Sequence, residues 1–154
     1  MKHVFRLTFA TGLLLAAGSV LAADMTPVGT WKTIDDATHQ PKSIVQITES
    51  DGMLQAKIVK LLNRSAEDIA KEGEQPLCKK CDGALKDKPI EGMTIMWGVS
   101  KDGNKWSGGK IVDPKSGKTY KVNLTVTNDG NSLDVHGYIG FALLGRTQTW
   151  QRQE

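Results

Sequence analysis

The chain has 154 residues, of which 39% are hydrophobic and 24% are charged, with 20 lysines and arginines against 17 aspartates and glutamates. Two of the basic residues, Lys2 and Arg6, belong to the N-terminal segment, so the remainder of the chain is close to neutral. Binding to a nucleic acid needs a concentrated basic face, and here the lysines are spread along the sequence. The composition therefore argues against a nucleic-acid partner and predicts one domain of about 130 residues.

The N-terminus has the layout of a secretory signal peptide, with basic residues in the first six positions, an apolar run over Leu7–Leu21, and Ala22 and Ala23 at the boundary. We predict a cleaved signal over residues 1–22, with cleavage after Ala23 as the alternative, and a mature domain over residues 23–154. An uncleaved anchor is disfavoured because a spanning helix needs ~20 apolar residues, and glycine, serine and threonine interrupt this shorter run. The expected destination is the periplasm, or else the medium, without stable membrane insertion.

The mature chain alternates between apolar and polar residues in short segments, which is the pattern of half-buried strands. In the clearest segment, Tyr120, Val122 and Leu124 share one face while Lys121 and Asn123 share the other. The eight predicted strands are Val28–Ile34, Lys42–Glu49, Met53–Leu62, Met93–Val99, Lys105–Val112, Lys118–Thr127, Ser132–Tyr138 and Gly145–Arg152.

Four of the connections are short and rich in glycine, asparagine and aspartate, which adopt positive φ at little cost. These turns are Ser50–Gly52, Asp102–Asn104, Pro114–Gly117 and Asp129–Asn131. Such turns join antiparallel neighbours, so we predict an all-β fold, an eight-stranded antiparallel up-and-down barrel that leaves no exposed sheet edge. A two-sheet sandwich is the alternative.

The connection over residues 63–91 departs from this pattern. Ser65, followed by Glu67 and Asp68, predicts one short, capped helical turn. A connection of this length in a compact domain usually carries function or covers another part of the molecule.

Cys78 and Cys81 lie in this long connection and are the two cysteines of the chain. In an oxidising compartment such a pair predicts a disulfide. Lys79 and Lys80 would favour a thiolate, so a redox-active dithiol is the alternative. Asp82 stands where haem attachment would need histidine, and further zinc ligands are not nearby, so we predict neither a metal nor a cofactor.

The sequence shows no pattern that predicts catalysis. His39 lies in a turn-like stretch, and His136 shares a strand face with Asp134, which favours a surface contact over an acid–base pair. The serines are not accompanied by a strained elbow motif or a nearby histidine and aspartate. We therefore expect a protein that is not an enzyme.

Gly29 and Trp31 form a Gly-x-Trp motif at the start of the first predicted strand, and the last strand carries Arg146 and Arg152. This combination resembles lipocalins and fatty-acid-binding proteins. In them an arginine of the last strand stacks on the tryptophan at the closed end of the barrel, a contact worth about 0.5–2 kcal/mol. Either arginine could fill this role here.

Aromatic residues suggest where a ligand would bind. Trp97 continues the face of Met93 and Ile95 and is expected in the core, with a ligand contact as the alternative. Trp106, Tyr138 and Phe141 are further candidates, and the segment around Phe141 could plug the barrel or form a lip for a guest. Together with Arg146, Trp97, Trp106, Tyr138 and Phe141 form the predicted ligand-binding set.

Motifs along the whole mature chain resemble an exported family common in Gram-negative bacteria, known as domain of unknown function 2147. The matching stretches include Gly29–Trp31, Ile58–Leu62, Cys78 with Cys81, Trp106–Gly109, Ser116–Tyr120, Gly137–Gly140 and Leu144–Thr147. The resemblance implies an exported, lipocalin-like barrel with the same cysteine loop. It carries no activity and no catalytic residue.

These observations favour a periplasmic, non-enzymatic binding module for a small apolar or amphipathic ligand. An eight-stranded barrel can hold one small ligand, or it can be filled by its own side chains. The alternatives are an envelope structural or interaction protein with a filled barrel, and a dithiol redox protein.

Overall fold

The computed structural model describes residues 25–153, and the predicted signal peptide with its two cleavage positions lies outside this range. The described chain contains eight strands: β1 (Gly29–Ile34), β2 (Pro41–Ser50), β3 (Met53–Leu61), β4 (Thr94–Asp102), β5 (Lys105–Val112), β6 (Thr119–Thr127), β7 (Ser132–Tyr138) and β8 (Arg146–Gln153). Every predicted strand is present, and its bounds agree with the prediction to within three residues.

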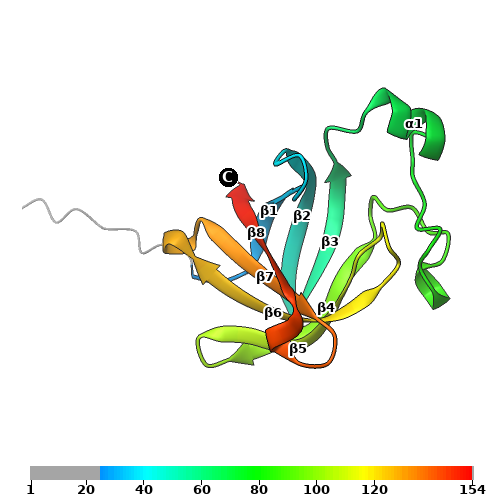
Figure 1. Cartoon of the computed structure of the whole chain (residues 1–154). Helices are drawn as coiled ribbons and strands as arrows, with labels where there is room; N and C mark the ends of the chain where they lie inside the picture. The colour runs from blue at the N-terminus through cyan, green and yellow to red at the C-terminus, as the bar shows by residue number, and fades with distance from the viewer. Residues whose placement is uncertain (1–24, 154) are drawn as a thin grey trace, which may run out of the picture.

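The eight strands form one closed barrel in which each strand pairs with the next and β8 returns to β1 (Figure 1). All of these pairings are antiparallel, so the predicted up-and-down barrel is confirmed and the sandwich alternative is wrong. The turn between β2 and β3 shows why neighbouring strands pair in antiparallel order. Asp51 and Gly52 have φ values of 52° and 74°, and two positive φ values in a two-residue turn match the right-handed twist of the strands.

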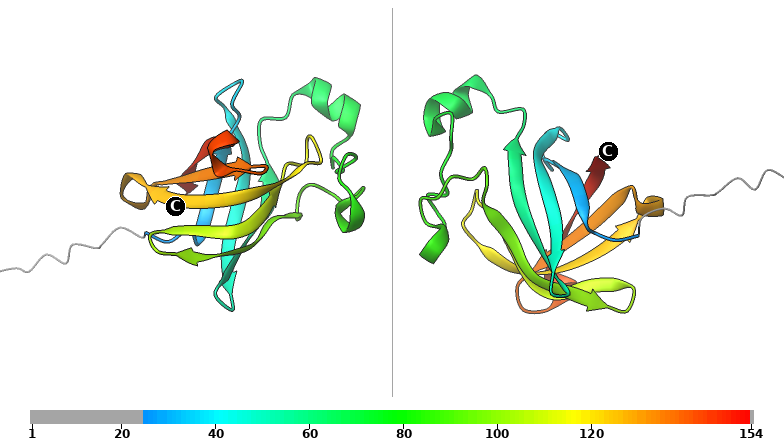
Figure 2. Two further views of the ribbon diagram at one scale, coloured as in Figure 1. Left: turned by 60° about the horizontal axis from the view of Figure 1, so that its bottom comes forward. Right: turned by 180° about the vertical axis from the view of Figure 1, so that it is seen from behind.

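The two ends of the barrel differ in their connections, as Figure 2 shows. At one end, here called the turn end, short turns join β2 to β3, β4 to β5 and β6 to β7. At the other end, here called the loop end, longer segments cover residues 35–40, 62–93, 113–118 and 139–145. Any access to the barrel from the loop end therefore passes between these segments.

The longest connection, between β3 and β4, begins with α1 (Ala66–Glu72), which stands off the barrel and buries no residue (Figures 1 and 2). The Ser65 hydroxyl accepts the Asp68 backbone N–H, and the Asp68 carboxylate accepts the Ser65 hydroxyl and backbone N–H. These two bonds to Ser65 hold the pKa of Asp68 below its usual value. The predicted capped turn is confirmed. Within residues 25–153, no helix has the length and apolar character that crossing a bilayer requires.

Candidate functional site

The turn end is closed by Trp31 and Arg152. The guanidinium carbon of Arg152 lies 4.2 Å from the centre of the Trp31 ring. Its nitrogens donate to the backbone carbonyls of Gly130, Val28 and Thr26, the last at 2.7 Å, while Trp31 Nε1 donates to Pro27 O at 2.7 Å. A Cβ on Gly29 would meet Arg152 Nη1 at 2.7 Å, so glycine leaves room for the arginine. Of the two arginines that the sequence left open, Arg152 makes this contact.

The middle of the barrel is packed with side chains. Val45, Met96 and Leu124, which lie inside strands β2, β4 and β6, are fully buried, with no surface accessible to water. Side chains without accessible surface contact one another directly, so they fill the space between the strands at this level. A ligand of any size must therefore bind nearer to an end of the barrel.

One hollow lies at the turn end and has a volume of about 420 Å³. Its lining includes Trp106, Glu49 and Lys101, and the Lys101 ammonium lies 5.6 Å from the centre of the Trp106 ring. Because an acidic and a basic side chain face the same hollow, it does not favour ligands of one charge.

A second hollow lies at the rim of the loop end and has a volume of about 270 Å³. Its lining residues come from β5, β6, the last residue of β7 and the β7–β8 connection: Lys110, Thr119, Tyr120, Lys121, Tyr138, Ile139 and Gly140. It joins two aromatic side chains and an isoleucine to two ammonium groups, and no acidic residue is among these seven. We call it the rim hollow.

The cations of the rim hollow belong to a row of four residues across the outer barrel face. The register pairs Trp97 of β4 with Lys110, Lys110 with Lys121, and Lys121 with Tyr138. Like charges directly opposite each other on antiparallel strands repel. Neither lysine makes an ion pair with any described residue. An anion placed between them would relieve this repulsion.

The predicted ligand-binding residues do not form one site. Tyr138 lines the rim hollow, Trp106 lines the hollow at the opposite end, and Phe141 is 79% exposed in the β7–β8 connection. Arg146 donates to Asp36 at 2.9 Å in an exposed ion pair. The segment around Phe141 points its large apolar side chains to solvent, so it does not plug the barrel.

The expectation that Trp97 faces the core is wrong. Its side chain is 37% exposed, whereas both Ile95 and Met96 are buried. Two irregularities in the β3–β4 register each insert an extra residue into β4, and each insertion reverses the alternation of inward and outward positions. Gly98, with a φ of 70°, lies in the irregularity between Met96 and Val99.

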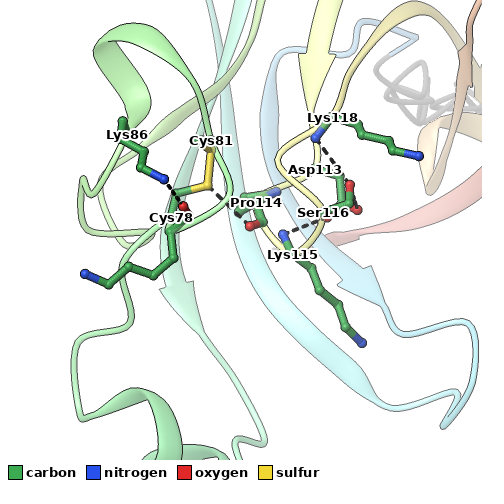
Figure 3. The surroundings of a disulfide bond; sticks show 9 residues. Cys78, Cys81, Lys86, Asp113, Pro114, Lys115, Ser116 and Lys118 are labelled. Carbon is green, nitrogen blue, oxygen red and sulfur yellow. Dashed lines mark hydrogen bonds between the residues drawn. A yellow bond between two sulfur atoms is a disulfide. The ribbon is translucent and has the colours of Figure 1, made fainter.

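The Cys78–Cys81 disulfide is present as predicted, and it lies against the β5–β6 turn at the loop end (Figure 3). Both cysteines are buried in one cluster with Ile95 and Val112. Cys78 Sγ lies 3.3 Å from the carbonyl oxygen of Pro114, in the β5–β6 turn. These contacts and the burial of both sulfurs favour a structural role over dithiol exchange.

Reducing the disulfide is expected to lower the free energy of unfolding by about 2 kcal/mol, because the bridge closes a small loop and restricts the unfolded chain. Thermal unfolding with and without a phosphine reductant measures this difference. Thiol labelling under native conditions should find both cysteines oxidised and inert. Rapid, reversible reduction of the folded protein without a change in melting temperature would instead favour the redox interpretation.

Among the described residues, His39, His136 and the acidic side chains do not assemble into a catalytic group. Asp134 accepts the Thr149 hydroxyl, while His136 bonds to Thr147 and to the carbonyl of Ala142. His39 lies in the β1–β2 connection with a φ of 57°. In the same connection, backbone N–H groups of Thr38 and Ala37 hold the pKa of Asp35 below its usual value. Among residues 25–153, no three histidine, cysteine or acidic side chains gather as metal ligands would.

The barrel, its stacked tryptophan–arginine end and the long connections at its other end define a lipocalin-like fold. The solved structure of protein HP1028 from Helicobacter pylori, described as belonging to the lipocalin family, is similar, with a TM-score of 0.69 and 21% sequence identity over 84% of each chain. This chain belongs to the family described as uncharacterized protein conserved in bacteria, DUF2147, whose model matches residues 29–152. Comparison with curated protein sequences found no match.

Proposed function

We propose that this protein is an exported, non-enzymatic binding module that takes a small amphipathic anion at the rim hollow. The observation that carries the proposal is the pair Lys110–Lys121, two directly opposed lysines without an acidic partner among the described residues, beside Tyr138 and Ile139. Ammonium groups bind a phosphate or carboxylate group as donors and as charges. The adjoining apolar side chains would cover an alkyl or aromatic part of the same ligand.

The packed interior supports a ligand position at the rim rather than inside the barrel. Lipocalin-like barrels can enclose a guest, but here Met96 and Leu124 are fully buried near the middle of the barrel. The ligand would therefore rest across the rim, between the ends of β5 and β7, with part of its surface in solvent. Export to the periplasm, which the N-terminal segment predicts, would place the module among envelope lipids and small amphiphiles.

The same filled interior favours a second candidate, a structural or interaction protein of the envelope that uses its outer surface. In that case the long connection between β3 and β4, fixed by Cys78 and Cys81, would be the contact surface. Crosslinking in cells with residues 63–75 deleted distinguishes the two, because loss of partners would support this candidate and unchanged partners would contradict it.

Native mass spectrometry of protein released gently from its own compartment tests the binding proposal. We expect a bound anionic amphiphile in the wild type, and its loss in the double variant Lys110→Glu/Lys121→Glu because two repulsive carboxylates replace the cations. Lys57→Glu/Lys60→Glu on β3 is the matched control and should retain the ligand. A clean unliganded mass for the wild type, or equal retention by both double variants, would contradict the proposal.

A further inference from the structure

The β7–β8 connection exposes large apolar side chains to an unusual degree. Ile139 is 64% exposed, Phe141 79%, Leu143 94% and Leu144 77%. Elsewhere in the described chain, the exposed large apolar residues, such as Met53, are scattered singly. Single exposed apolar residues are ordinary, but four within six consecutive positions form a patch that marks an interaction surface.

Specific contacts hold this segment in place on the outer face of β7. Ala142–Leu144 form one turn of 3-10 helix. His136 Nδ1 lies 2.8 Å from the Thr147 hydroxyl, and His136 Nε2 lies 2.5 Å from the carbonyl oxygen of Ala142. Because a carbonyl only accepts, Nε2 carries the proton in this contact. A Cβ on Gly145 would meet His136 Nε2 at 2.7 Å, so glycine permits this close packing.

The apolar segment adjoins the cationic row. Ile139 and Gly140 line the same hollow as Lys110 and Lys121. Trp97 and Tyr138 flank the two lysines in that row. Asp36 pairs with Arg146 and Asp134 accepts the Thr149 hydroxyl, and neither makes an ion pair with Lys110 or Lys121. The molecule thus presents an apolar tip beside a row in which two amphipathic rings flank two ammonium groups.

These three kinds of side chain are the ones that suit the layers of a membrane surface. Leucine and phenylalanine partition into the acyl boundary, tryptophan and tyrosine favour the headgroup level, and lysine ammonium groups attract anionic phosphates. The core of a protein interface, in contrast, is depleted in lysine. Leu143 is almost fully exposed, so its side chain extends into the solvent. Such a side chain can insert into a lipid layer, which needs no preformed pocket.

We propose that residues 139–144 dock this protein onto the surface of a bilayer that contains anionic phospholipid. Phe141, Leu143 and Leu144 enter the headgroup–acyl boundary, while Lys110 and Lys121 lie at the level of the phosphates. The docking is peripheral and reversible, with the barrel outside the membrane. The inference shares Lys110 and Lys121 with the proposed function, but its apolar anchor, Phe141, Leu143 and Leu144, does not line the rim hollow.

Vesicle sedimentation of the exported, processed protein tests this inference. We expect binding to vesicles of phosphatidylglycerol mixed with phosphatidylcholine, and much weaker binding to phosphatidylcholine alone. Leu143→Asn/Leu144→Asn should weaken the partition coefficient at least roughly tenfold, since two exposed leucines leave the acyl boundary. Raising the salt concentration to 0.5 M should weaken it as well, because salt screens the lysine–phosphate attraction.

Two variants at the turn end serve as controls, Met53→Ser for apolar exposure and Lys105→Glu for charge, and both should bind like the wild type. Circular dichroism checks that every variant is folded. The inference fails if the wild type does not sediment with anionic vesicles, or if the double leucine variant binds as well as Met53→Ser. It also fails if residues 139–144 mediate self-association of the protein and added vesicles do not reduce that self-association. Vesicle binding can fail while an amphiphile still copurifies, which separates this inference from the proposed function.

Discussion

Arg152→Ala is expected to lower the free energy of unfolding by about 3 kcal/mol, because one side chain makes both the stacking contact and charge-assisted hydrogen bonds. The guanidinium covers the Trp31 ring and donates to the carbonyls of Thr26, Val28 and Gly130. It thereby ties the segment before β1 and the β6–β7 turn to the last strand. A domain of this size should lose roughly 10 °C in melting temperature.

Arg146→Ala is the matched control, since Arg146 lies on the same strand, β8. Its ion pair with Asp36 is exposed, and such pairs contribute about 1 kcal/mol or less. The loss of unfolding free energy in Arg152→Lys should be intermediate between those of the two alanine variants, because lysine retains the charge but not the planar guanidinium group. Thermal unfolding followed by circular dichroism measures all three, and equal destabilisation by the two alanine variants would refute the assignment of Arg152 to the closed end.

Gly117→Ala is expected to cost about 2–4 kcal/mol of unfolding free energy, through backbone strain and a clash with the cysteine loop. Gly117 has a φ of 73°, which side-chain-bearing residues rarely adopt. An added Cβ would also overlap the backbone carbonyl of Lys80 and approach Cys81 N at 2.9 Å. The cysteine loop and the β5–β6 turn would have to separate.

Gly52→Ala is the matched control, because it introduces the backbone strain without a clash. Gly52 has a similar φ of 74°, but nothing lies within 4 Å of its added Cβ, so its loss should be about 1 kcal/mol. Gly117→Ala should also speed reduction of the Cys78–Cys81 disulfide by a phosphine, whereas Gly52→Ala should leave that rate unchanged. Equal effects of the two substitutions on stability and on reduction would contradict the packing of the cysteine loop against the turn.

Strand positions and turns could be predicted from the sequence because both are local. Alternation along Tyr120–Val126 and the Asp51–Gly52 turn depend on neighbouring residues alone. The choice between Arg146 and Arg152 could not be made in this way. It depends on the β1–β8 register, which places Trp31 opposite Arg152, and that register joins the two ends of the chain.

The candidate site could be predicted less well, for the same reason. The prediction that Trp97 faces the core is wrong because the irregularities in β4 reverse the orientation of its side chain. These irregularities depend on the pairing of β4 with β3, which is not local in sequence. Lys110 and Lys121 were missed because lysines on exposed strand positions are ordinary in sequence. Their opposition became visible with the β5–β6 register. The sequence did carry a signal for this pair. The two lysines occupy outward positions on consecutive hairpin strands, at equal distances from the turn.

The most direct test of binding at the rim is a titration of ¹⁵N-labelled exported protein with dihexanoyl phosphatidylglycerol, kept below its micelle concentration. We predict saturable shifts of the amide resonances of Lys110, Lys121 and residues 138–140, and little response to dihexanoyl phosphatidylcholine. Shifts centred on Trp106 and the turn-end hollow, or no saturable shifts at all, would contradict the account.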